Sequence, residues 1–213
     1  MKKFLLLVVA AFVCSTMSAQ LVTSTTYKKK SSETVWYVKA GMNLSKFTGD
    51  NVEADNLVGY NIGIAFDRAI GGSGMFWGMG LQLARKGYKA SYEEENYSKE
   101  VKLKANKLEI PINIGYKYNI NDDIAIDARI GGFINYDVWG KAKYEETEYG
   151  DSYEESINIG DIEGYDRFGA GIQFGIGVWY QKINFNITYQ KGLVDQLEGA
   201  KESNWMLSLG YAF

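Results

Sequence analysis

Six charged side chains lie within segments where apolar and polar residues alternate, and their types and spacing would allow ion pairing or acid–base chemistry. They are Lys39, Asp67, Glu109, Lys117, Asp127 and Arg129. Because both signs are present, these side chains could pair with one another if the fold encloses them, and so fill a polar interior. A catalytic use would have to rely on carboxylates alone.

The sequence contains no histidine, and its one cysteine is Cys14. Ser-His-Asp and Cys-His catalysis and imidazole metal sites are therefore ruled out. Carboxylates cluster in three short runs, but their spacing matches no calcium-binding loop, and we interpret the runs as solvated loop surfaces. The runs are Glu93-Glu94-Glu95, Glu145-Glu146 and Glu154-Glu155. The glycines at 71, 72 and 74 precede no helix of the kind that a phosphate-binding loop needs. We expect no enzymatic activity, no metal and no cofactor.

Alternation of apolar and polar residues in eight segments indicates the elements that position these charges, because a period of two is typical of β-strands. The segments cover residues 36–45, 58–67, 75–84, 108–118, 124–136, 168–179, 183–190 and 205–213. Short connections (69–74, 119–122 and 181–182) alternate with long ones (48–56, 88–103, 141–164 and 192–203). This order predicts an all-β fold, an eight-stranded antiparallel up-and-down transmembrane β-barrel. Pro111 lies inside the fourth segment, and we expect a local bulge there because proline has no N–H to donate.

The period alone does not say which face is inside, since a soluble barrel with an apolar interior has the same alternation. Here the smaller face carries glycine, alanine, amides and the six charges, as in the filled lumen of a small membrane barrel. Aromatic residues gather at both ends of the apolar band, where a membrane has its two interfaces. We therefore predict that the large apolar face contacts lipid.

The N-terminus predicts export. Lys2 and Lys3 precede an apolar run from Phe4 to Val13, and Ala19 supplies a small residue before the cleavage position, which is the pattern of a cleaved signal peptide. A lipoprotein site at Cys14 is disfavoured by the bulky Val13 before it. We predict a signal peptide (1–19), a flexible leader (20–34) and a barrel domain (35–213). Without Lys2 and Lys3, the 23 basic residues fall to 21 against 26 acidic ones, a net charge of −5 that disfavours nucleic acid as a partner.

One stretch resembles a known family. Leu108-Glu109-Ile110-Pro111, followed by residues 112–118, is similar to the Leu-Glu-Ile-Pro strand of the PorT-like outer-membrane β-barrel family of Bacteroidota, whose barrels are of the OmpX/OmpA type. The resemblance implies the cell outer membrane, and Phe213 as the terminal aromatic residue read by the barrel assembly machinery. The alternation of short and long connections predicts periplasmic termini. Some members of this family are linked to type IX protein secretion.

Two functions remain from the sequence. The first is a structural or interaction barrel that displays acidic loops to a protein partner, to a secretion complex, or to lipopolysaccharide through divalent cations. The alternative is a narrow porin-like channel, which is disfavoured because side chains fill the lumen of an eight-stranded barrel. For the first function we expect a hairpin beyond the membrane, which would either pair with a partner strand or be a solvated hairpin without a partner. Its candidate contact residues are Tyr144, Tyr149, Tyr153, Ile157 and Ile159.

Overall fold

The protein was analysed as a computed structural model that describes residues 33–49, 55–94, 97–148, 151–162, 164–196 and 200–213. The described residues form nine β-strands. They are β1 (Thr34–Gly49), β2 (Leu57–Ala69), β3 (Met75–Glu94), β4 (Tyr97–Asn119), β5 (Ile124–Glu148), β6 (Asp151–Asn158), β7 (Phe168–Tyr180), β8 (Ile183–Gly192) and β9 (Ala200–Ala212). In this part of the chain, no helix has the length and apolar character needed to cross a membrane. The predicted signal peptide and nearly all of the predicted leader lie outside the described residues.

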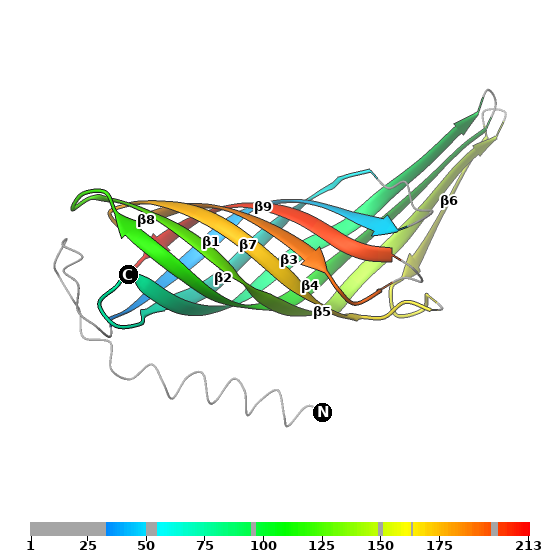
Figure 1. The fold of residues 1–213 in the computed structure, drawn as a ribbon. Helices are drawn as coiled ribbons and strands as arrows, with labels where there is room; N and C mark the ends of the chain where they lie inside the picture. The colour runs from blue at the N-terminus through cyan, green and yellow to red at the C-terminus, as the bar shows by residue number, and fades with distance from the viewer. Residues whose placement is uncertain (1–32, 50–54, 95–96, 149–150, 163, 197–199) are drawn as a thin grey trace.

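Eight of the strands close into a ring, as the alternation predicts (Figure 1). Neighbours in sequence pair antiparallel except β6 and β7, β1 pairs with β9, and β4 pairs with β5 along its whole length. The strand β5 pairs first with β7 and then with β6, so β6 lies outside the ring. A closed ring leaves no strand edge within the barrel wall, which an apolar environment requires.

The apolar face points outward. Ile130 is 61% exposed, whereas its neighbour Arg129 is 8% exposed and faces the lumen. The same alternation continues around the ring, with Ile112, Ile172 and Leu209 outside. The wall therefore offers lipid a continuous apolar surface, and the polar face is enclosed.

All three short turns lie at one end of the barrel, together with the C-terminus, and we call this the turn end (Figure 1). Gly71 and Gly74 take positive φ values of 63° and 97° in the turn before β3. Between β4 and β5, the Asn121 side chain accepts hydrogen bonds from the backbone N–H groups of Asp123 and Ile124, at 2.9 and 2.7 Å. These local bonds fix the reversals that the sequence predicts.

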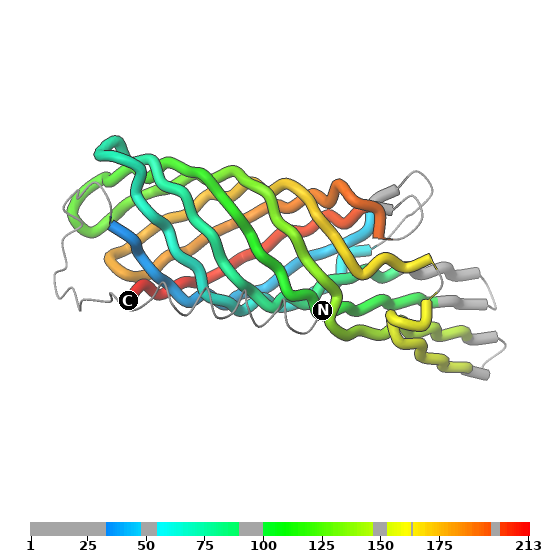
Figure 2. Tube along the Cα trace, turned by 90° about the horizontal axis from the view of Figure 1, so that it is seen from below, coloured from blue at the N-terminus to red at the C-terminus, as the bar shows by residue number. Residues whose placement is uncertain are grey.

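Two of the predicted long loops are largely strand. The hairpin expected within 141–164 is present as the end of β5 with β6, whereas the strands within 88–103 correct the sequence interpretation. The segments 88–103 and 141–164 contain the ends of β3 and β5, the start of β4, and β6. These parts form a four-stranded sheet that projects beyond the barrel at the end opposite the turns (Figures 1 and 2). We call it the fin, made of residues 87–94, 97–105, 140–148 and 151–158. Charged residues cover its outer face, so the apolar signal that marked the membrane strands is weaker there.

Pro111 causes no bulge, contrary to expectation. The β3–β4 register is the same on both sides of it, at Met79–Ile112 and Gln82–Glu109, but the two residue pairs in between are not paired. The missing N–H of proline therefore opens the ladder locally without shifting it. The β-bulge lies elsewhere, where Lys107 is opposite Asp137 but Asn106 is opposite Trp139.

Candidate functional site

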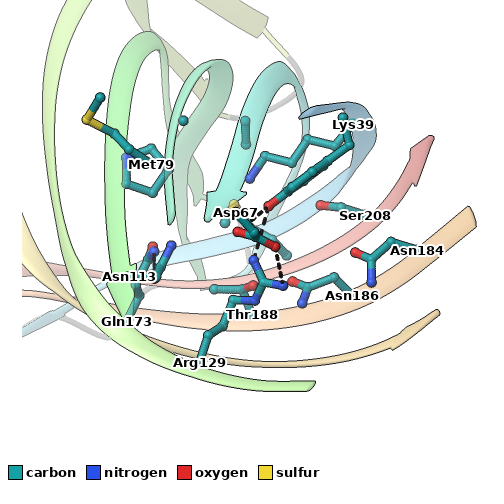
Figure 3. A pocket seen from close by; sticks show the side chains of 15 residues that line it. Lys39, Asp67, Met79, Asn113, Arg129, Gln173, Asn184, Asn186, Thr188 and Ser208 are labelled. Atoms are coloured by element: carbon teal, nitrogen blue, oxygen red, sulfur yellow. Dashed lines mark hydrogen bonds and ion pairs between the residues drawn. The ribbon is translucent and has the colours of Figure 1, made fainter. Parts of the chain in front are cut away.

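Charged side chains in the lumen form two separate layers rather than one cluster. In the layer near the turn end, Arg129 of β5 bonds the carboxylate of Asp127 at 2.9 Å and that of Asp67 on β2 at 3.4 Å. It also donates to the Tyr37 hydroxyl at 3.1 Å, and the Trp179 indole donates to Asp127 at 2.6 Å. Figure 3 shows Arg129 and Asp67 facing each other across the lumen.

Beside a hollow of about 90 Å³ that Asp67 and Lys117 help to line, an apolar cluster lies in the lumen at this end. It consists of Tyr37, Ala65, Ala125, Trp179 and Ala212. The Lys117 ammonium lies 3.7 Å from the centre of the Trp179 ring, a cation–π distance, and Lys117 is directly opposite Asp127 on β5.

The second layer lies nearer the fin and centres on Lys86 and Lys107, which sequence reasoning missed. Lys86 bonds Glu109 at 2.5 Å and Glu202 at 2.9 Å, and Lys107 bonds Glu202 at 2.7 Å and Asp137 at 3.2 Å. All five side chains are at most 4% exposed. The parity of β3 and β4 could have revealed both lysines, because Lys86 continues the inward positions of Gln82 and Ala84, and Lys107 precedes Glu109 by two residues.

Amide side chains complete this second layer. Gln190 of β8 accepts from Lys86 at 2.7 Å and donates to Glu109 at 2.7 Å. Gln196, in the segment before β9, accepts from Lys107 at 2.6 Å. Glu109 therefore belongs to this layer and not, as expected, beside Asp127 and Arg129. Each charge in this layer lies within 3.2 Å of an oppositely charged group, which offsets the cost of removing it from water.

A small cavity of about 30 Å³ lies beside Arg129 and Asp67 of the layer near the turn end (Figure 3). Lys39, Asn113, Gln173, Asn186, Thr188 and Ser208 are among the residues that line it. Space of this size holds about one water molecule. Across the described lumen the charges balance, with five cations and five anions. The cations are Lys39, Lys86, Lys107, Lys117 and Arg129, and the anions are Asp67, Glu109, Asp127, Asp137 and Glu202.

A second apolar cluster covers the lumen at the fin end. Leu103, Ala105 and Ile159 are at most 2% exposed, and Tyr88, Ile162 and Tyr165 pack against them. The Tyr165 hydroxyl donates to the Asp137 carboxylate, which joins this cover to the charged layer below. Burial, and then the nearby Asp137 carboxylate, raise the pKa of Tyr165 well above its ordinary value.

The two faces of the fin differ in character. On the outer face, Lys102 of β4 lies opposite Lys143 of β5, and Glu100 lies opposite Glu145. The inner face carries Val101, Leu103, Ala142, Tyr144, Tyr153 and Ile157, with Glu146 and Glu155 between them. An aromatic and aliphatic surface above the barrel mouth is thus combined with a charged surface that continues the outer wall.

The residues expected to contact a partner lie in different environments. Tyr153 is 67% exposed on the inner face of β6, and Tyr144 and Ile157 are half-buried on the same face. Ile159 is 2% exposed inside the cover of the lumen, so it has no surface to offer, which corrects the expectation for this residue. Tyr149 lies outside the described residues.

The acidic runs behave as parts of strands. Glu145 is opposite Glu154 on the outer face, and Glu146 and Glu155 lie on the inner face. Glu93 and Glu94 belong to β3, and Glu95 lies outside the described residues. Over the described ranges, no three Asp, Glu or Cys side chains are arranged to hold a metal ion.

Phe213 follows the last strand at the turn end. Its ring is 66% exposed, and its backbone N–H donates to the Trp36 carbonyl at 3.0 Å. The terminal residue is therefore held by β1 while its side chain stays accessible on the outside of the barrel.

Comparison with known proteins supplies a family and a set of similar folds. The family model described as "Outer membrane protein beta-barrel domain" matches residues 4–213. The attachment invasion locus protein Ail of Yersinia pestis is 19% identical, with 85% of this chain and 99% of that chain covered and a TM-score of 0.41. Neisserial surface protein A is 12% identical (84% and 97% covered, TM-score 0.43), and OprG of Pseudomonas aeruginosa is 11% identical (87% and 98% covered, TM-score 0.42). No curated protein matches the chain.

Proposed function

Since the chain belongs to the outer membrane protein beta-barrel domain family, we propose that it is a structural and interaction protein of the cell outer membrane, which displays the fin to a protein partner. The observation that carries this proposal is the fin itself. Its strands continue beyond the ring, and their inner face presents aromatic side chains that the barrel does not need for closure.

The chemistry of the fin suits protein recognition. Tyr153 is largely exposed, and tyrosine gives contact area at a low cost in conformational entropy. The strand β6 pairs with β5 on one side and with no other described strand, so its second edge can accept an added strand. Main-chain hydrogen bonds along that edge would supply affinity, and Tyr144, Tyr153 and Ile157 would supply selectivity.

The lumen supports this role better than the porin-like alternative. Two apolar clusters cover the ends, and two layers of hydrogen-bonded charges fill the space between them. The central cavity of about 30 Å³ is too small for a continuous water path. A solute would have to break several buried ion pairs to cross.

In this proposal the turn end faces the periplasm and the fin lies outside the cell, after the signal peptide at residues 1–19 is removed. Short turns at one end and long extensions at the other are typical of bacterial outer-membrane barrels in this orientation. Phe213 would then be available to the assembly machinery, and lipid would surround the apolar wall. The resemblance of residues 108–118 to the PorT-like barrels of Bacteroidota adds a protein-secretion complex as the partner class to examine first.

Site-specific photo-crosslinking in whole cells tests the proposal. A photoreactive amino acid at Tyr153 would report on the inner face, and the same residue at Glu154, its neighbour on the outer face, is the matched control. We expect a discrete crosslinked protein from position 153 and much less from position 154. Replacing residues 145–154 by Asn-Gly keeps Tyr144 opposite Glu155. This change should abolish binding of the partner while the barrel still assembles. Equal crosslinking at both positions, or a partner retained after this replacement, would refute the role of the fin.

A further inference from the structure

Basic residues form an isolated row on the outer face of the fin, just beyond the aromatic residues that end the lipid-facing wall. Lys104 of β4 lies directly opposite Lys141 of β5, and both side chains are exposed. The preceding position on β5 with the same orientation is Trp139, which is 51% exposed. Two residues of strand rise by about 6 to 7 Å, so the lysine row stands at the height of lipid headgroups if Trp139 marks the membrane interface.

The positive charges of the next row, Lys102 and Lys143, are neutralised by ion pairs, whereas those of Lys104 and Lys141 are not. Lys102 bonds Glu100, Lys143 bonds Glu154, and Lys89 bonds Glu100 at 2.7 Å. Within the described residues, Lys104 and Lys141 make no hydrogen bond or ion pair. Two like charges directly opposite each other on a sheet destabilise it unless an anion lies between them. The position therefore favours occupation by a negatively charged group.

Two arginines reinforce the positive charge on either side of this row. Arg85 of β3 lies over the Tyr60 ring at 5.0 Å and donates to Asn106 at 3.2 Å. Arg167, just before β7, lies over the Tyr136 ring at 5.2 Å and donates to the Val138 carbonyl at 2.6 Å. Both guanidinium groups are thus fixed on aromatic side chains of the outer wall.

From this geometry we propose that Lys104 and Lys141 bind the phosphate of a phosphorylated glycolipid, the lipid A part of lipopolysaccharide, at the outer-leaflet surface. Two ammonium groups one row above an aromatic band are placed to bind the phosphate of a lipid whose acyl chains pack against the apolar wall. Glu100, Glu145 and Glu154, farther from the membrane, neutralise the neighbouring lysines, so the unpaired positive charge is confined to the row of Lys104 and Lys141. The site thus differs from the acidic, cation-bridged contact with lipopolysaccharide that the sequence suggested.

Which leaflet supplies the lipid depends on the orientation proposed above, but the binding chemistry does not. The experiment therefore uses purified protein in detergent micelles titrated with lipid A, with bound lipid counted by native mass spectrometry. The double variant Lys104→Gln/Lys141→Gln should bind lipid A roughly 30-fold more weakly than the unmodified protein. The matched control is Lys102→Gln/Lys143→Gln, which removes the same charge from the next row and should stay within about twofold.

Lipid A stripped of its phosphates, and phosphatidylglycerol, serve as comparison ligands. We expect both to bind far more weakly than lipid A, and the difference to disappear in Lys104→Gln/Lys141→Gln. Equal loss in the two double variants, or dephosphorylated lipid A binding as well as lipid A, would overturn the site. Equal binding of phosphatidylglycerol would overturn its assignment to a glycolipid. The assay contains no protein partner, so its failure leaves the crosslinking result at Tyr153 untouched.

Discussion

Replacing Lys86 by methionine tests whether the ion pairs near the fin end hold the barrel together. The ammonium group pairs with Glu109 at 2.5 Å and Glu202 at 2.9 Å, and all three side chains are at most 4% exposed. Removing it leaves Glu109 with only amide donors and Glu202 with Lys107 alone. One cation then faces three buried carboxylates, and losing one partner of a buried pair costs about 3 to 5 kcal/mol.

Urea unfolding of the barrel, refolded into lipid vesicles and followed by tryptophan fluorescence, measures this free energy. Lys143→Met is the matched control, because Lys143 pairs with Glu154 on the exposed outer face of the fin. Because this ion pair is exposed to water, we expect the change to leave the free energy of unfolding nearly unaltered. The double variant Lys86→Met/Glu109→Gln should recover part of the loss, since it also removes a stranded carboxylate. If Lys86→Met costs no more than Lys143→Met, the buried layer does not stabilise the barrel as argued.

Two further changes examine the lipid-facing wall and the cover of the lumen. Ile130 and Ile120 are both exposed on the outside of the protein, but Ile130 lies in the wall and Ile120 lies in the turn before β5. Ile130→Lys should cost about 2 to 4 kcal/mol in the same urea assay, whereas Ile120→Lys should cost less than about 1 kcal/mol. Similar costs would contradict the depth in the membrane that we assign to these residues. Tyr165→Phe removes the hydrogen bond to Asp137 and should cost about 1 to 3 kcal/mol at pH 7. Because the folded-state pKa of Tyr165 is raised, its contribution is fully present below the unfolded pKa of about 10 and declines as the pH rises above it. The gap between wild type and Tyr165→Phe should therefore narrow above pH 10, and a gap that widens there would contradict the argument.

The membrane part of the fold could be predicted because each strand there solves the same physical problem. A residue such as Ile130 must face lipid and its neighbour Arg129 must not, so the period of two carries both the strand and its orientation. The short turns were predictable as well, since Gly71, Gly74 and Asn121 have the conformations and side-chain bonds that reversals need. The number of membrane strands and the short turns between them follow from these local patterns.

The fin and the second charged layer were harder to predict, for one common reason. Outside the membrane both faces of a strand can carry polar residues, so the sequence predicts a charged loop over 88–103, although Leu103 and Ala105 alternate with Lys102 and Lys104. Once these residues are recognised as strand, every second residue of β3 and β4 continues to face inward, and this places Lys86 and Lys107 in the lumen. Pairing across the ring with Glu202 depends on closure of the barrel, which no local pattern encodes.

The surfaces proposed for function are physically separate from the groups that stabilise the barrel. Lys104 and Lys141 on the outer face, and Tyr153 on the inner face, are exposed, whereas Lys86, Glu109 and Glu202 are enclosed. Changes at distant sites without shared partners usually add in free energy. A variant of the fin surface can therefore lose lipid A or a protein partner at nearly unchanged stability, and a lumen variant can lose stability with its binding surface intact. A fin variant that weakened binding only by unfolding the barrel would contradict this separation.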